Sequence, residues 1–110
     1  MNTNEVSMNS NDIMNAIEQA MIECEELNRL QPLEAALNSM GVEADVRNPR
    51  TTDECMIIPG FGIVMLDSKH GGWWTRDKPS WDLTGDDVAH EREGLLIELF
   101  KVTRFVQPVQ

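Results

Sequence analysis

Two histidines, two cysteines and a surplus of carboxylates are the residues of this chain whose types could support chemistry. The segment HEREG, which begins at His90, lacks the second histidine that zinc proteases place four residues after the first. The Cys and His residues fall at Cys24, Cys55, His70 and His90, in unrelated segments without the short ligand spacing of structural zinc sites. We therefore expect no metal site.

Candidate nucleophiles and acid–base pairs are equally isolated. A nucleophilic Cys55 would need a neighbouring base, which no local pattern supplies. Asp86 and Asp87 lie where a last helix is expected to begin, and carboxylates there stabilise the helix dipole. The glycines of residues 59–62 fit a hairpin turn, and no phosphate-binding glycine loop, G-x-S-x-G motif or calcium loop is present. The chain is expected to be non-enzymatic and without a cofactor; a small enzyme with an unrecognised site is an alternative.

Three tryptophans, Trp73, Trp74 and Trp81, fall within nine residues, in a neighbourhood that combines aromatic with basic side chains. The basic side chains there are those of Lys69, His70, Arg76 and Lys78. Adjacent residues of a strand point to opposite faces, so Trp73 and Trp74 cannot both enter one core. The cluster fits packing under a loop, anchoring of a protein interface, in which Trp and Arg are enriched, or stacking of nucleobases.

Negative charge is concentrated in the first 46 residues, which contain nine acids and one basic residue and so carry −8 of the net charge of −10. The acids are Glu5, Asp12, Glu18, Glu23, Glu25, Glu26, Glu34, Glu43 and Asp45, opposed by Arg29. Such a field attracts cationic partners and repels nucleic acid and anionic membranes. The longest uncharged stretch outside the N-terminal tail, residues 55–66, is too short to span a bilayer. We expect a protein partner with a basic surface, and no direct contact with nucleic acid or membrane.

Hydrophobic periodicity and capping residues predict the elements that must position these side chains. The expected helices are residues 11–30, 32–40 and 85–106, and the expected strands are residues 42–46, 54–58, 62–67 and 73–76. Ser10 or Asn11 offers an N-cap for the first helix, Pro32 suits the first turn of the second, and Gly41 suits its end. The expected fold is α+β: two N-terminal helices, a three- or four-stranded antiparallel meander and a C-terminal helix packed on the sheet, with the helices mainly on one face.

A chain of 110 residues, 41% of them hydrophobic, is long enough to bury the core of one domain. We expect a flexible tail at residues 1–10 and a single domain at residues 11–110. Cys24 and Cys55 lie in apolar patterns typical of buried free thiols, and the N-terminus lacks the basic segment of a signal peptide. These features favour a cytoplasmic protein with reduced cysteines.

The central strands are apolar without interruption. Residues 56–58 and 63–66 do not alternate with polar side chains, as a sheet with one solvated face would require, so both faces are expected to be covered. The last helix is expected on one face, with the first helix or the tryptophan-rich loop on the other. The alternative is a second copy or another partner on the second face, which leaves monomer and homodimer both open.

Charge and aromatic clustering together predict a small acidic protein-binding module that inhibits or regulates another protein by direct contact. The expected partner-binding residues are Glu18, Ile22, Glu25, Glu26, Arg29, Trp73, Trp74, Arg76 and Trp81. Ile22 is expected opposite the buried stripe of the first helix, as an apolar anchor among charges that steer association. One alternative is a nucleic-acid mimic that blocks a nucleic-acid-binding enzyme, as compact acidic proteins of viruses and mobile elements do. Another is an acidic face that serves solubility alone.

Overall fold

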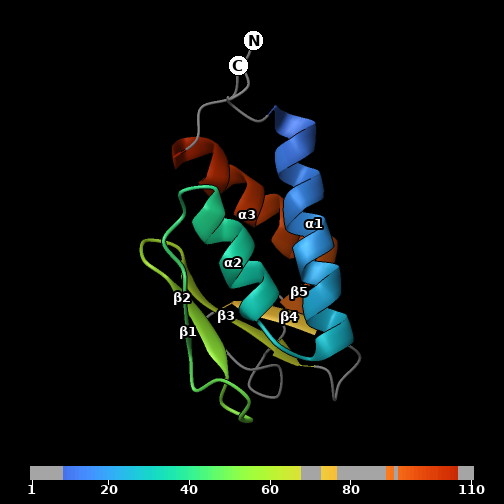
Figure 1. Cartoon of the computed structure of the whole chain (residues 1–110), viewed down its shortest axis with the longest axis vertical. Coiled ribbons are helices and arrows are strands. Elements are labelled where there is room, and N and C mark those ends of the chain that lie inside the picture. The colour runs from blue at the N-terminus through green and yellow to red at the C-terminus, as the bar shows by residue number, and fades with distance from the viewer. Residues whose placement is uncertain (1–8, 68–72, 77–88, 91, 107–110) are drawn as a thin grey trace.

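The computed structural model describes residues 9–67, 73–76, 89–90 and 92–106. The elements are α1 (Ser10–Leu27), α2 (Gln31–Ser39), β1 (Asp45–Arg47), β2 (Cys55–Ile58), β3 (Gly62–Asp67), β4 (Trp73–Arg76), β5 (Ala89–His90) and α3 (Arg92–Val106). The strands form one antiparallel sheet in the order β1-β2-β3-β4-β5. Figure 1 shows the three helices packed together on one side of this sheet. The expected α+β class, with a C-terminal helix on an antiparallel sheet, is confirmed.

Both ends of α1 are fixed by asparagine. The side chain of Asn9 caps the first turn by accepting a hydrogen bond from the backbone nitrogen of Asp12 at 2.9 Å. At the other end Asn28 adopts a left-handed conformation with φ of 55°, and its N–H donates to the carbonyl of Cys24. The helix therefore ends at Leu27, three residues earlier than the apolar spacing predicted.

The second helix begins and ends much as its sequence predicted. Pro32 lies in its first turn, where a missing N–H costs nothing. Gly41 follows the helix with φ of 88°, and the N–H of Val42 donates back to the carbonyl of Leu37 at 2.9 Å. A glycine accepts this conformation without the steric cost of a Cβ, so it reverses the chain toward the sheet.

The sheet has an inner face that is buried and an outer face that is not. The inner face carries Met56, Ile58, Val64 and Trp74, all buried in a core shared with the helices. Residues that face each other across neighbouring strands share a face, so Ile57 and Ile63, which are paired, lie together on the outer face. The expectation that the first helix covers this second face is wrong, because α1 packs with the other helices against the inner one.

The last helix begins at Arg92, not at residue 85. Ala89 and His90, assigned to that helix by their spacing, form β5 instead and pair with Thr75 and Trp74 of β4. Hydrogen bonds to a neighbouring strand outweigh the weak helix preference of such a short segment. The sheet therefore has a fifth, two-residue strand beyond the expected meander. The strand expected at residues 42–46 is shorter and begins and ends later, at Asp45–Arg47.

Two side chains of α2 occupy the free edge of β1. Asn38 Oδ1 accepts a hydrogen bond from the backbone nitrogen of Ala44 at 3.0 Å, and Glu34 Oε2 accepts one from Val46 at 2.8 Å. Four residues of helix rise by ~6 Å and two residues of strand by ~6.8 Å, so the two spacings match. Helix α2 thus takes the place of a neighbouring strand at this edge.

Candidate functional site

The outward face of α1 carries three of the residues expected to bind a partner. At 3.6 residues per turn, Glu18, Ile22 and Glu26 fall within about 80° of one another around the helix axis. Glu18 and Ile22 are half-buried and Glu26 is exposed. Within the described part of the chain, the carboxylates of Glu18 and Glu26 take part in no hydrogen bond or ion pair. No described residue therefore neutralises either carboxylate by direct contact.

Ile22 lies between these two carboxylates and is not a core residue. It belongs neither to the buried core nor to the partly buried apolar side chains that pack against it. The buried stripe of α1 consists of Ile13, Ile17, Ala20, Met21 and Cys24, on the other side of the helix. An aliphatic side chain between carboxylates that have no partner among the described residues is an arrangement that can anchor a protein partner, because charge steers association and burial supplies affinity.

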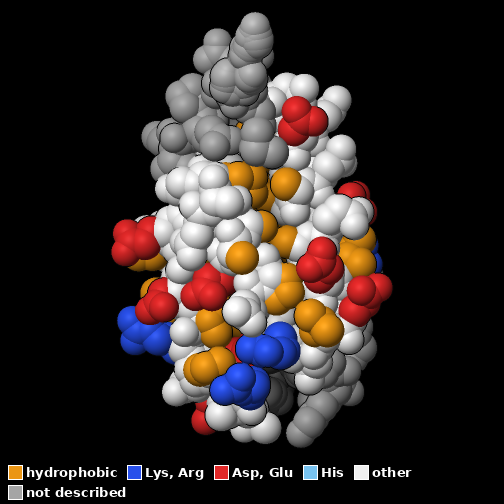
Figure 2. All heavy atoms as spheres, in the orientation of Figure 1, with side chains coloured by type: hydrophobic (Ala, Val, Ile, Leu, Met, Phe, Trp, Pro, Cys, Tyr) orange, Lys and Arg blue, Asp and Glu red, His pale blue; other side chains and the backbone are white. Residues whose placement is uncertain are grey.

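Acidic side chains are distributed over the surface around this helix. Figure 2 shows separate Asp and Glu side chains among uncharged atoms on the face formed by α1 and α2, apolar side chains along the seam between the helices, and Lys and Arg side chains toward one end. Glu23, which also belongs to α1, is exposed and forms no ion pair with any described residue. The field of this face is therefore negative, as the sequence indicated.

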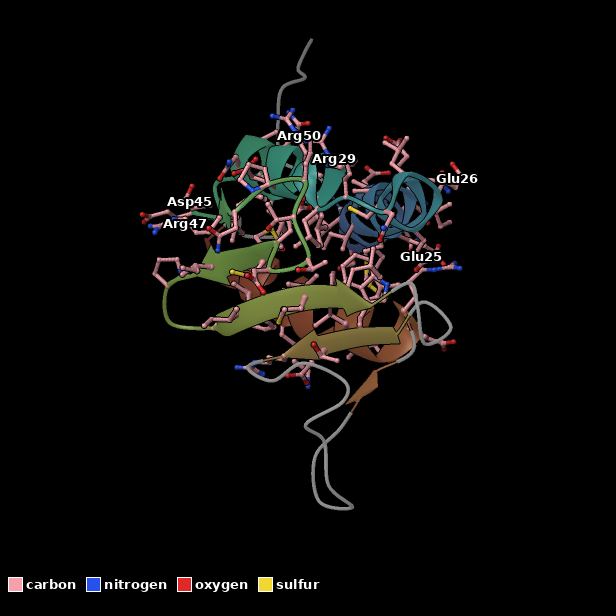
Figure 3. All side chains as sticks on the ribbon, turned by 90° about the horizontal axis from the view of Figure 1, so that it is seen from below. Glu25, Glu26, Arg29, Asp45, Arg47 and Arg50 are labelled. Atoms are coloured by element: carbon pink, nitrogen blue, oxygen red, sulfur yellow. The ribbon has the colours of Figure 1, made fainter. Side chains whose placement is uncertain are left out.

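Glu25 has a different role from its neighbours on α1. Figure 3 shows its side chain turned toward the sheet, while Glu26 points outward. Trp74 Nε1 donates to Glu25 Oε2 at 2.8 Å, and Arg92 donates to the same carboxylate through Nε at 2.9 Å and Nη2 at 3.2 Å. One carboxylate thus joins α1, β4 and α3, and the structure brings Glu25 and Trp74 together inside the molecule.

Arg92 was not singled out by the sequence, because its partner lies 67 positions away and no local pattern marks it. The hydrogen bond that Arg92 donates to Glu25 raises the pKa of Arg92 above its ordinary value; slight burial opposes this, and the charges of Glu25 and Glu18 add to it. The guanidinium therefore stays charged and holds the Glu25 carboxylate in place. Trp74 is completely buried, so it has a structural role and not one of direct contact with a partner.

Arg76 is also engaged within the molecule. Its Nη1 donates to Glu98 Oε1 at 3.0 Å and its Nε to the carbonyl of Phe61 at 2.9 Å. The guanidinium carbon lies 3.9 Å from the centroid of the Phe61 ring. Glu98 Oε2 in turn lies 3.6 Å from Lys101 Nζ. The side chain therefore ties α3 to the β2–β3 turn.

Arg29 does not continue the outward face of α1, because the helix has ended before it. Figure 3 shows Arg29 beside Arg50 and directed away from Glu25 and Glu26. Beneath the loop that carries Arg50, the Glu54 carboxylate accepts hydrogen bonds from the backbone nitrogens of Leu30 and Arg50, each at 2.6 Å. These bonds hold the β1–β2 loop against the α1–α2 connection. Arg29 Nε is buried and has no hydrogen-bond partner among the described residues.

The remaining predicted residues and the candidate chemistry can be placed only in part. Trp81 and the side chain of Trp73 lie outside the described residues. Burial raises the pKa of Cys24 to about 12, so this thiol is not a nucleophile at neutral pH. Cys24 and Cys55 are both free thiols. Among the described side chains, no three Cys, His, Asp or Glu residues converge where a metal ion could be held.

No helix within the described ranges is long and apolar enough to cross a membrane. Comparison of the chain with protein-family models, with curated proteins and with solved structures returns no match.

Proposed function

We propose that the protein is a non-enzymatic binding module that inhibits or regulates a protein partner with a basic surface, through the outward face of α1. The observation that carries the proposal is Ile22, which lies outside the core between Glu18 and Glu26, two carboxylates without a hydrogen bond or ion pair among the described residues. Long-range attraction would bring a cationic partner to this face, and burial of Ile22 would hold it there.

The packing of α1 supports this role by making its outward face rigid. The helix contacts α2 along one flank and α3 along another. The bonds from Trp74 and Arg92 to Glu25 fix its rotation about its own axis. A face that does not have to order itself on binding loses less entropy when the complex forms.

The alternative of nucleic-acid mimicry receives less support from the charges of α1. A helix of 18 residues spans ~27 Å, a length over which one side of a DNA duplex carries roughly eight phosphates. Four acids of α1 remain without a partner among the described residues: Asp12, Glu18, Glu23 and Glu26. Glu25 and Glu34 are used inside the molecule. The negative surface therefore favours a small basic patch on a protein partner over a duplex-binding groove.

Affinity capture from a native host lysate tests the proposal with one variant and one matched control. Ile22→Asp should lose the captured partner, whereas Leu27→Asp, on another side of the same helix and 61% exposed, should retain it. Both variants should keep the thermal midpoint of the wild type within a few degrees, which circular dichroism checks. Capture that survives Ile22→Asp in a folded protein would overturn the proposed site.

Salt and charge reversal test how the acidic residues act. Glu18→Lys combined with Glu26→Lys should slow association with the captured partner and flatten its salt dependence, because exposed charges act mainly on encounter. Glu43→Lys, a reversal of equal sign away from α1, is the control. An association rate that is unchanged across salt concentrations would show that the acids serve solubility alone, and release of the partner by duplex DNA would favour mimicry.

A further inference from the structure

The outer face of the sheet is apolar and partly open. Along β2 burial alternates: Met56 and Ile58 are buried on the inner face, while Cys55 and Ile57 are only half-buried on the outer one. On β3, Ile63 is 40% exposed. An antiparallel sheet with one solvated face normally carries polar side chains there, so apolar residues on this face indicate a surface that is covered in the functional protein.

The opening is confined to one part of the face. Thr75 of β4 is fully buried although its register with Met65 places it on the outer side. The open region therefore lies over β1, β2 and β3. Three strands at ~4.8 Å spacing, with β3 about 20 Å long, give it a footprint of about 300 Å². This is well below the roughly 800 Å² per partner of a stable interface, so whatever covers it binds weakly or transiently.

The charges on this face identify its occupant. Asp45 and Arg47 of β1 pair with Ile57 and Cys55 of β2, which places both charged residues on the outer face. Both side chains are exposed and form an ion pair with each other, in which Arg47 Nε lies 2.5 Å from Asp45 Oδ2. Among the described side chains, the open region thus carries one acid and one base beside an apolar centre, and these two charges cancel. A strongly basic partner gains nothing here, but a second copy of the same surface is complementary to it.

We propose that two copies of the chain associate through the outer faces of β1, β2 and β3, related by a twofold axis. The axis brings the Ile57–Ile63 pair of one copy against that of the other. It also sets Asp45 of each copy opposite Arg47 of the partner copy, because a twofold interface presents the same patch twice in opposite directions. Association by strand addition at β1 is blocked, since Asn38 and Glu34 already occupy the outward amides of Ala44 and Val46.

Self-repulsion does not prevent this arrangement. The unpaired acids of α1 lie on the helix layer, on the far side of the sheet from the contact. With layers packed ~10 Å apart, the two α1 helices of the dimer are about 30 Å from each other, several times the ~8 Å screening length at physiological salt. Salt should therefore strengthen self-association slightly while it weakens binding of a basic partner to α1. The dimer would present two docking faces on opposite sides.

Analytical ultracentrifugation over a wide concentration range tests the dimer with three substitutions on three different surfaces. The wild-type chain should rise from 12.5 kDa toward twice that mass in the upper micromolar range and above. Leu27→Asp on α1 and Ile97→Asp on α3, at residues 61% and 44% exposed, should behave like the wild type, whereas Ile63→Asp should stay monomeric. A 12.5 kDa species at every concentration, or a dimer lost with Ile97→Asp and kept with Ile63→Asp, would overturn the proposal.

A charge exchange tests the twofold contact without altering an apolar residue. Asp45→Arg alone places like charges opposite each other and should weaken the dimer severalfold. The double variant Asp45→Arg with Arg47→Asp restores opposite charges and should recover the wild-type dimerisation. Failure of the double variant to recover, with both proteins folded by circular dichroism, would rule out this orientation. Ile63→Asp should still capture the α1 partner, so the two proposals succeed or fail separately.

Discussion

Removal of the Glu25 carboxylate should destabilise the fold chiefly through Trp74. The indole N–H donates to Glu25 Oε2 at 2.8 Å from a fully buried ring, so it regains an acceptor only if water enters the space that the carboxylate leaves. Arg92, in contrast, has a side chain that is 38% exposed and can regain water when its partner is removed. The same carboxylate thus serves one donor on a buried ring and one donor that is partly exposed.

The magnitudes follow from this difference. A buried donor left without an acceptor costs about 1–3 kcal/mol, whereas a partly exposed ion pair contributes about 0–1 kcal/mol. Glu25→Ala should therefore lower the free energy of unfolding by about 2–3 kcal/mol. Glu25→Gln keeps an oxygen for the indole and loses only the ion pair, so it should cost at most about 1 kcal/mol, and Arg92→Ala should cost the same.

Urea unfolding followed by far-UV circular dichroism measures all three variants at neutral pH. The expected order of stability is wild type first, then Glu25→Gln and Arg92→Ala together, then Glu25→Ala. At about 4 °C of melting temperature per kcal/mol, the last variant should melt roughly 10 °C below the wild type. If Glu25→Gln is as unstable as Glu25→Ala, the ion pair and not the indole bond holds the helix, and the reasoning is refuted.

Three further outcomes are expected. The buried Cys24 thiol should resist alkylation in the native state. Because its pKa is raised to about 12, the unfolded thiol ionises between pH 9 and 12 and the folded one does not, so over this range the wild type should lose stability relative to Cys24→Ala. Equal pH profiles of the two proteins in urea unfolding would contradict this. Asn28 has a φ of 55°, a conformation in which only glycine avoids the steric cost of a Cβ. Asn28→Ala should therefore lower the stability by about 1 kcal/mol and Asn28→Gly should leave it unchanged, as measured by thermal melting. Leu99→Ala should lower the free energy of unfolding by about 2–5 kcal/mol and Ile97→Ala by under about 0.5 kcal/mol, since Leu99 is fully buried and Ile97 is 44% exposed. Similar losses for the two variants in urea unfolding would mean that the buried face of α3 is misassigned.

The elements that the sequence predicted best are those bounded by local turn signals. The strands at Gly62–Asp67 and Trp73–Arg76 have the expected bounds. Gly60, with φ of 80°, lies in the turn that precedes the first of them, and Gly62, with φ of 142°, begins that strand. The start of the last helix was wrong because residues 89–90 are held by β4, and such a contact has no local signature. The position of α1 on the inner face could not be predicted either, because it depends on packing between residues that are distant in the sequence.

The candidate site shows the same division between local and distant information. A helical repeat suffices to place Ile22 opposite the buried stripe, between Glu18 and Glu26. It does not distinguish Glu25, one residue earlier, whose role depends on Trp74 and Arg92, 49 and 67 positions away. Arg29 was grouped with these acids on the assumption that the helix continued, but the left-handed Asn28 turns the chain before it.

The contacts of α2 with the edge of β1 impose a length on the chain between them. Asn38 reaches the amide of Ala44, and Glu34 reaches that of Val46, so the connection at residues 40–44 sets which amides meet which side chains. Successive amides of a strand point in opposite directions. One inserted or deleted residue would therefore shift β1 and place carbonyl groups, instead of amides, opposite the side-chain oxygens of Asn38 and Glu34. We expect single-residue insertions or deletions in this connection to be harmful, whereas many substitutions at its exposed positions would be tolerated.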